Sequence, residues 1–312
     1  MWGNIMTRRK FDIKMSDGAI LKHQEDSLKY ITGKQNRYSH IEYPLVDGNI
    51  VPVIKYDIFN QYSELIHGFS TRMGGVSKDH LSSMNLSFSR GDDKENVIEN
   101  HRRFGEALGY DSTRLVFSDQ VHDISIKKVT SLDVGKGITI DSDIKNIDGL
   151  VTNESNIPLI TFFADCVPLY FYDPANKVIG LAHSGWKGTV AKIGTKMIEI
   201  MTKEYGSNPE DIICAIGPSI CKSCYEVSQD VAVAFKDAYS EEEYTSMIVD
   251  KGNEKFLLDL HMACKYNLLN AGVMPEHIAM PDLCTCCNSS VLFSHRASNG
   301  MRGNLAAVMM LK

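Results

Sequence analysis

The sequence predicts a domain that mixes β-strands with α-helices, and three observations support this fold class. Apolar runs at 159–163, 167–172 and 178–182 carry the β-branched and aromatic residues of buried strands. Elsewhere, 94–108 and 257–271 space their apolar residues at helical intervals. With 43% hydrophobic residues among 312, the chain is long and apolar enough for a sizeable core.

The N-terminal part of the chain differs from the rest. Residues 1–47 are polar and show no sustained hydrophobic period, so we treat them as an N-terminal extension that can hold short hairpin strands. No repeat, low-complexity tract or linker divides residues 48–312, so we treat this part as a single domain.

The remaining elements follow from local patterns along the chain. Apolar runs next to turn residues predict strands at 50–58, 65–72, 115–121, 124–129, 147–152, 212–216, 292–296 and 305–311. Helical spacing predicts further helices at 189–203 and 228–238. The helix at 94–108 can be capped by Asp92 or Asp93 and ended by Gly109.

Charge and hydropathy exclude several classes of partner. The formal net charge is −6 and no basic run is longer than Arg8-Arg9-Lys10, so we expect no nucleic-acid partner. No apolar stretch resembles a signal peptide or a membrane span, so we expect no membrane partner and a cytoplasmic protein. Eight cysteines in such a chain indicate reduced thiols. The oligomeric state stays open.

Polar, reactive residues interrupt the central apolar strands, where a purely structural strand would gain more from Val or Ile. A tight turn at 173–177 joins two of these strands. If the hairpin is centred near Ala175, the partner of residue n is about 350 minus n. This register places Cys166 opposite Ser184 and next to His183.

Three residues at predicted strand ends could bind a metal ion: His122, Cys166 and His183. Zn²⁺ favours imidazole and thiolate ligands at about 2.0–2.3 Å, and three protein ligands leave a fourth position open for catalysis. The alternative is a buried cysteine with two satisfied core histidines, and spacing alone does not separate the two. Asp165 and Asp148 are candidate proton carriers or partners of a ligand histidine.

A second set of cysteines follows, namely Cys221, Cys224, Cys284, Cys286 and Cys287. Four thiols there could hold a structural zinc ion. We take Cys284-Thr-Cys286-Cys287 to lack the two-residue spacing with which both thiolates of a knuckle reach one ion. We therefore expect thiols without a metal.

Cationic side chains beside glycine-containing loops are candidates for binding an anionic substrate group: Arg72, Lys187 and Arg296. For each of them, a solvated surface charge is the alternative. The loop at 185–188 also opens a predicted helix, whose N-terminus attracts anions.

Several motifs resemble those of one known family. In order along the chain they read HGFSTRMGGVS (67–77), NLSF (85–88), QVH (120–122), DGLVT (148–152), ADCVPL (164–169), HSGWKG (183–188), AIGPSICKSCYEV (215–227) and FSHRAS (293–298). Together they resemble the YfiH-like family, which is described either as multicopper polyphenol oxidoreductase, of laccase type, or as purine nucleoside phosphorylase. The motifs cover nearly the whole chain after the extension.

The resemblance implies a fold and a metal site. The fold is α+β, with β-sheets packed between helices in a layered sandwich similar to that of cysteine hydrolases. The motif residues His122, Cys166 and His183 are the family's metal ligands and, with Asp165, the expected catalytic residues. The expected ion is Zn²⁺, with copper as the alternative. Asn85 joins the three cationic residues as an expected substrate-binding residue.

The resemblance also implies an activity. It indicates zinc-dependent phosphorolysis of a small nucleoside, namely adenosine, inosine or methylthioadenosine, with phosphate as the second substrate and adenosine deamination as a further reaction. Three positions depart from the family pattern: Asp123 replaces Gly, Lys187 replaces Arg, and Met-Arg-Gly at 301–303 replaces Thr-Gly-Arg. None of them removes an expected metal ligand.

Three function classes stay compatible with the sequence: a zinc nucleoside enzyme, a copper phenol oxidase and a thiol hydrolase. A multicopper oxidase needs several ions and many paired histidines, whereas this chain has ten histidines and no His-x-His. A thiol hydrolase would use Cys166 with a histidine base, but a bound metal would occupy that thiolate. We therefore rank the zinc nucleoside enzyme first and the copper oxidase second.

Overall fold

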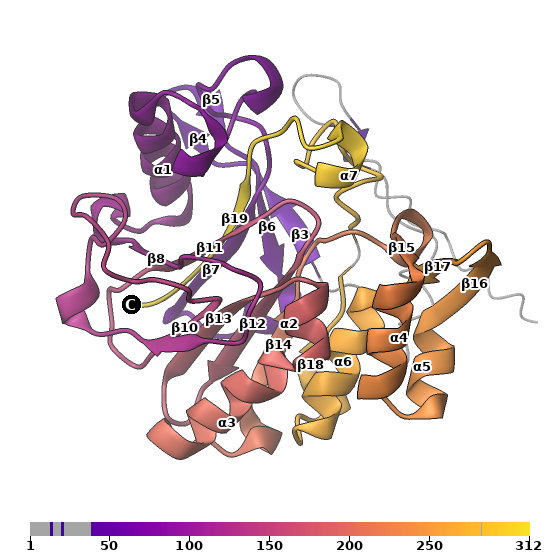
Figure 1. The fold of residues 1–312 in the computed structure, drawn as a ribbon. Coiled ribbons are helices and arrows are strands. Elements are labelled where there is room, and N and C mark those ends of the chain that lie inside the picture. The colour runs from indigo at the N-terminus through magenta and orange to yellow at the C-terminus, as the bar shows by residue number, and fades with distance from the viewer. Residues whose placement is uncertain (1–12, 15–19, 22–38, 282) are drawn as a thin grey trace, which may run out of the picture.

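The computed structural model describes residues 13–14, 20–21, 39–281 and 283–312, and its centre is a pair of six-stranded sheets (Figure 1). The first sheet contains, in spatial order, β18 (Ile278–Ala279), β14 (Ile213–Ile216), β12 (Val167–Asp173), β13 (Val178–Ser184), β10 (Gly149–Thr152) and β9 (Ile126–Lys128). The second contains β3 (Ser39–Glu42), β6 (Val53–Tyr56), β7 (Leu65–Ser70), β19 (Leu305–Leu311), β11 (Leu159–Phe163) and β8 (Val116–Phe117). Most neighbouring strands are antiparallel, and the pairs with β8, β9 and β18 are parallel.

Helices and smaller sheets surround this pair. The helices of the described residues are α1 (Lys94–Leu108), α2 (Trp186–Val190), α3 (Ile193–Tyr205), α4 (Gln229–Ala238), α5 (Glu241–Met247), α6 (Leu260–Asn270) and α7 (His295–Ser298). The smaller sheets pair β15 (Glu226–Ser228), β17 (Lys255–Leu258) and β16 (Ile248–Gly252), then β4 (Leu45–Val46) with β5 (Asn49–Ile50), and β1 (Ile13–Lys14) with β2 (Ile20–Leu21). No helix in these described ranges is long and apolar enough to cross a membrane.

Alternate residues of the first sheet face two different cores. Tyr170 of β12 and Leu181 of β13 pack between the two sheets, against Leu159 and Met309 of the second sheet. Phe171 faces the opposite way, into a core shared with α3, α4 and α6. Helix α1 covers the outer face of the second sheet. The layers are therefore helix, sheet, sheet and helix, which confirms the predicted α+β fold with β-sheets packed between helices.

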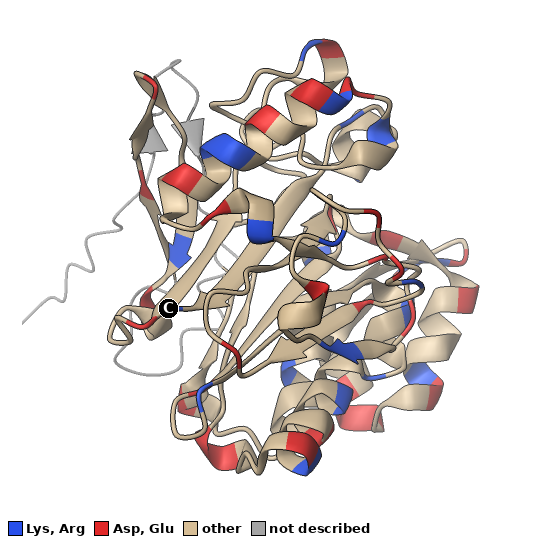
Figure 2. Ribbon diagram, turned by 90° about the vertical axis from the view of Figure 1, so that its left-hand side faces the viewer, with Lys and Arg blue, Asp and Glu red and all other residues tan. Residues whose placement is uncertain are grey.

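Charges of both signs are mixed along the surface helices (Figure 2). On α1, Arg102 pairs with Glu99 and Glu106, each at 2.8 Å. Exposed pairs of this kind contribute at most about 1 kcal/mol. Their effect is to balance the charge of the helix locally.

Most predicted elements are present, and several strands are shorter than expected. Helix α1 has the predicted bounds and ends at Gly109, which has a φ of 82°. The prediction of a single helix at 189–203 is wrong. This part of the chain forms two helices, α2 and α3, because Lys192 between them adopts a left-handed conformation with a φ of 64°.

Two further predictions are corrected near the C-terminal end. The strand predicted at 292–296 is wrong, because Ser294 accepts a hydrogen bond from the Ala297 N–H and so begins helix α7. The first residues of the helix predicted at 257–271 belong to β17, and the helix begins only after its cap, Asp259.

The hairpin of β12 and β13 is shifted by one residue from the predicted register. Pro168 pairs with His183, so the partner of residue n is 351 minus n. The turn has four residues, 174–177, and its centre therefore falls beside Ala175 instead of on it. A one-residue shift exchanges the two faces of a strand. Cys166, two positions before Pro168, therefore lies on the same face as His183.

Part of the predicted extension contributes to the described sheets. β3 and β4 lie within 1–47, and β3 pairs with β6 at the edge of the second sheet. Residues 1–12, 15–19 and 22–38 of this predicted extension lie outside the described residues. The division at residue 47 stays a prediction.

Candidate metal centre

Three side chains that the sequence analysis names as metal ligands meet in the structure. The ligand atoms of His122, Cys166 and His183, which we call the His-Cys-His centre, lie within 4.8 Å of one another. Cys166 Sγ is 3.8 Å from His122 Nε2, and the two imidazole centroids are 4.8 Å apart. His122 lies in the loop after β8, Cys166 in the bend between β11 and β12, and His183 near the end of β13. Strand ends of both large sheets therefore carry the centre.

The carboxylate of Asp148 connects two members of this centre. Asp148 is fully buried and accepts a hydrogen bond from His183 Nδ1 at 2.8 Å. It also accepts the three backbone N–H groups of 121–123 at 3.0–3.1 Å. The first contact places a proton on Nδ1, so Nε2 is the nitrogen that interacts with Cys166 and that would bind a metal ion after losing its own proton. The other three hold the loop of His122. Asp148 is thus the partner of a candidate ligand histidine, one of the two roles that the sequence suggested for it.

Gly185 leaves the space in which His122 and Cys166 approach each other. A Cβ atom at this position would lie 2.7 Å from His122 Cδ2 and 3.4 Å from Cys166 Sγ. The first distance is below van der Waals contact, so a larger residue would displace the imidazole. The sequence pattern predicts only a loop at Gly185 and gives no signal that this residue lies against His122 and Cys166.

The electrostatics of the centre favour a thiolate beside an imidazolium. Burial alone would raise the pKa of Cys166, but His183 and His122 outweigh it and lower this pKa to about 6. Burial would lower the pKa of His183, whereas Cys166 and Asp148 raise it to about 9. At neutral pH, Cys166 is therefore a deprotonated sulfur that can bind a metal ion or attack a substrate.

Asp165 anchors the bend that presents Cys166. Thr285 Oγ1 donates to one oxygen of its carboxylate at 2.6 Å, and the backbone N–H of Arg296 donates to the other at 2.7 Å. The backbone φ of Asp165 is 91°, which is rare for a residue other than glycine. Its predicted part in proton transfer stays a prediction.

The two arginines predicted to bind an anion make hydrogen bonds to backbone carbonyl groups. Arg72 uses Nε and Nη1 for two such bonds, at 2.8 and 2.9 Å. Arg296 donates to the carbonyl oxygens of Cys224 and Glu226, both at 2.9 Å. Each guanidinium therefore holds loops together, and anion binding by either stays a prediction.

Lys187 and Asn85 lie in contrasting surroundings. Lys187 is exposed on α2, with Nζ 5.7 Å from the centroid of the Trp186 ring. Asn85 is fully buried, and its amide makes four hydrogen bonds to neighbouring loops. These bonds favour a structural part for Asn85, and its contact with a substrate stays a prediction.

Arg302, which the sequence did not indicate as an anion binder, interacts electrostatically with Cys166 of the His-Cys-His centre. Burial and the charge of Arg90 lower the pKa of Arg302 to about 10, while Asp165 and Cys166 act in the opposite direction, so Arg302 has Arg90, Asp165 and Cys166 as charged neighbours. Within the described residues, Nε of Arg90 and Nε of Arg302 are buried without a hydrogen-bond partner. Neighbouring cations with unpaired donors favour a bound anion. Arg302 lies in a turn that departs from the family pattern, but no local signal indicates Arg90.

Comparison with known proteins finds relatives over most of the chain. A model of the family described as multi-copper polyphenol oxidoreductase laccase matches residues 66–312. Purine nucleoside phosphorylase YlmD of Bacillus subtilis (strain 168) is 38% identical over 250 residues, which are 80% of this chain and 89% of that protein. The crystal structure of YlmD from Geobacillus stearothermophilus is similar with a TM-score of 0.80 and 32% identity, over 88% of this chain and 100% of that one. The Bacillus licheniformis hypothetical protein YfiH gives a TM-score of 0.79 and 34% identity, over 83% and 96% of the chains.

Proposed function

The chain belongs to the family described as multi-copper polyphenol oxidoreductase laccase, and we propose that it is a zinc-dependent purine nucleoside phosphorylase acting on adenosine and inosine. The relatives that carry the name purine nucleoside phosphorylase support the substrate class. One observation supports the reaction above all others: the guanidinium of Arg302 interacts electrostatically with Cys166 of the His-Cys-His centre and with Arg90, and within the described residues the Nε atoms of both arginines are buried without a hydrogen-bond partner. Phosphorolysis requires a phosphate site of this kind beside the nucleoside.

The ligand set of the His-Cys-His centre suits zinc. Two imidazoles and one thiolate are ligands that Zn²⁺ prefers, and three protein ligands leave one position open. The Asp148 carboxylate behind His183 is the partner that zinc-binding histidines usually have. Zinc bound by His122, Cys166 and His183 would supply Lewis-acid polarisation of an oxygen of the substrate or of water.

The chain's own residues would bind and orient phosphate. Phosphorolysis breaks the N-glycosidic bond, joins a phosphate oxygen to C1′ of the ribose, and lets the departing base take up a proton. Positive charge develops on the ribose during this step, so an adjacent phosphate both stabilises that charge and attacks the carbon. In this proposal Arg90 and Arg302 hold the phosphate through charge-assisted hydrogen bonds. Asp165 keeps the bend of Cys166 in place beside them.

The alternative functions make different demands on the same residues. A thiol hydrolase would use Cys166 as nucleophile, and the lowered pKa of this thiol suits that part as well as metal binding. A copper phenol oxidase would need several copper ions per chain. Adenosine deamination would proceed without phosphate and release ammonia.

Chromatography of nucleoside reactions tests the proposal. With phosphate, we expect inosine to yield hypoxanthine and ribose 1-phosphate, and adenosine to yield adenine. Without phosphate, release of the base should stop, and any conversion of adenosine to inosine then measures deamination. Rapid phenol oxidation with stoichiometric copper, in protein that consumes no nucleoside, would contradict the proposal.

The variant Arg302→Gln separates phosphate binding from metal binding. We expect the KM for phosphate to rise by about tenfold or more, because a charge-assisted contact is lost, while the zinc content stays unchanged. Arg114→Gln is the matched control, since Arg114 donates to the carbonyl oxygen of Asn156 away from these groups. An unchanged KM for phosphate in Arg302→Gln would move the phosphate site elsewhere.

A further inference from the structure

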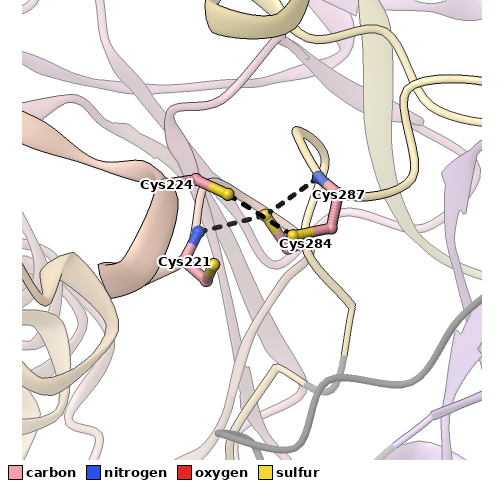
Figure 3. A group of neighbouring side chains, drawn as sticks. All are labelled: Cys221, Cys224, Cys284 and Cys287. Carbon is pink, nitrogen blue, oxygen red and sulfur yellow. Dashed lines mark hydrogen bonds between the residues drawn. The ribbon is translucent and has the colours of Figure 1, made fainter.

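We propose that Cys221, Cys224, Cys284 and Cys287, the four-cysteine cluster, bind a structural Zn²⁺ ion at a site separate from the His-Cys-His centre. Their sulfur atoms lie within 4.8 Å of one another (Figure 3). A tetrahedral zinc site has Zn–S distances of about 2.3 Å, which places its sulfurs about 3.8 Å apart. Cys224 Sγ and Cys287 Sγ are 3.4 Å apart. The cluster is thus close to the arrangement that a single ion requires.

The spacing along the chain fits such a site. Cys221 and Cys224 form one C-x-x-C pair, and Cys284 and Cys287 form a second. Two pairs of this kind are typical of structural zinc sites. The expectation that the segment at 284–287 lacks the two-residue spacing is wrong, because Thr285 and Cys286 are the two residues between Cys284 and Cys287. Cys286 packs instead against the core that α4 and α6 share with the first sheet.

Backbone N–H groups fix the position of Cys284 within the cluster. Cys284 Sγ accepts the N–H of Cys221 at 3.2 Å and the N–H of Cys287 at 3.4 Å. These two hydrogen bonds connect the sulfur of one C-x-x-C pair to the backbone of both pairs. A short 3-10 turn at Lys222–Cys224, closed by the Cys224 N–H on the Cys221 carbonyl at 3.0 Å, brings the first pair together.

Two disulfide bonds are the chemical alternative for four neighbouring cysteines. An S–S bond is about 2.05 Å long. The sulfurs of Cys224 and Cys287 are 3.4 Å apart, and all eight cysteines of the chain are thiols in the structure. Disulfides also require sulfurs that approach in separate pairs, whereas all four converge here. Convergence favours one shared ion.

The four-cysteine cluster joins two loops that border the His-Cys-His centre. From the first loop, the Ile220 N–H donates to the Asp165 carbonyl oxygen at 3.0 Å. From the second, Thr285 Oγ1 donates to the Asp165 carboxylate at 2.6 Å. Arg296 also reaches the carbonyl oxygen of Cys224. A zinc ion in the cluster would therefore brace the bend before Cys166 from outside the site of reaction.

Metal analysis of protein purified without added metal tests this proposal. We expect about two zinc ions per wild-type chain and about one in each of His183→Ala, Cys284→Ala and Cys287→Ser, since each change removes a ligand from one site only. Cys286→Ser is the matched control and should keep both ions. One zinc ion per wild-type chain, lost completely in His183→Ala, would overturn the proposal.

Cobalt substitution provides a second readout that does not depend on the folding of a cluster variant. In Cys166→Ala protein loaded with Co²⁺, we expect intense sulfur-to-cobalt charge-transfer absorption, because the remaining thiolate ligands are those of the cluster. Adding Cys287→Ser should weaken this absorption. The proposal would be contradicted if Cys166→Ala loaded with Co²⁺ showed no charge-transfer absorption. It would also be contradicted if the four cysteines of the cluster formed disulfides in freshly purified protein. Neither readout uses nucleoside turnover, so the two proposals fail independently.

Discussion

The carboxylate of Asp148 accepts the Nδ1–H of His183 at 2.8 Å and also holds the backbone of 121–123, the loop that carries His122. One buried carboxylate therefore orients one imidazole and positions the other. The two histidines lie far apart in the sequence, so their shared partner makes the geometry of the centre depend on a single side chain.

We expect Asp148→Asn to lower zinc affinity by about 10- to 100-fold, the usual effect of losing the carboxylate partner of a zinc-binding histidine. The melting temperature should also fall, because the amide NH₂ group would face N–H donors. Competition with a chromogenic chelator measures the affinity. Asp143→Asn, which changes an exposed carboxylate paired with Lys136, is the control. Equal zinc affinity in wild type and Asp148→Asn would contradict the assigned part.

Gly185→Ala should disturb the His-Cys-His centre with little effect on the rest of the fold. The new Cβ would lie 2.7 Å from His122 Cδ2, so the imidazole must move away from Cys166. We expect reduced zinc content and reduced turnover. Gly194→Ala in α3 is the matched control, because its Cβ would meet neighbours only at 3.4 Å and alanine favours a helix. Full zinc occupancy in Gly185→Ala would show that the centre tolerates the displacement.

The reactivity of Cys166 in metal-free protein should follow its lowered pKa. Because the thiolate is the reactive form and the pKa is about 6, alkylation by iodoacetamide should rise with pH around a midpoint near 6. His183→Ala removes a neighbouring positive charge and should move the midpoint upward. Cys214, whose pKa is raised by burial, should stay unreactive throughout. A wild-type midpoint near 8.5, the ordinary value for cysteine, would contradict this prediction.

His101 should make the protein less stable in acid. It is fully buried, and burial lowers its pKa to about 4, although the hydrogen bond with the Leu86 carbonyl opposes this. An unfolded histidine titrates near pH 6.5, so the unfolded state binds the proton first as the pH falls. The stability that this residue contributes is therefore complete above pH 6.5 and is lost between pH 6.5 and 4, by at most about 3 kcal/mol.

Urea unfolding of wild type and His101→Gln at pH 7 and pH 5 measures this effect. The difference in free energy of unfolding between the two proteins should shrink at pH 5, because only the wild type loses the contribution of a neutral buried imidazole. His80→Gln, at an exposed histidine, is the control and should show no such change. A difference that is the same at both pH values would assign the acid sensitivity to other groups.

Local sequence patterns predicted two kinds of element correctly. The first kind has start and stop signals within its own sequence, and the second is a strand buried on both of its faces. Helix α1 has its own apolar period and terminal glycine and the predicted bounds, although its N-cap residue Asp93 makes no side-chain capping hydrogen bond. The strand β11 has the predicted bounds too. β12 and β13 are covered on both faces, so their apolar runs are continuous and easily recognised. The break at Lys192 has no such signal, because it depends on how α2 and α3 pack.

The sequence by itself named His122, Cys166 and His183 as candidates for the His-Cys-His centre, because these polar, reactive residues lie at the ends of apolar strands and within motifs that resemble those of the family. Only the tertiary structure decided how they meet. A one-residue shift in the β12–β13 register places Cys166 on the face of His183, and Asp148 and Gly185 shape the approach of His122. The closeness of Arg90 to Arg302 and the convergence of the four-cysteine cluster also depend on contacts between distant segments. Such contacts follow from sheet register and loop packing, which the hydrophobic period of a single strand or helix does not contain.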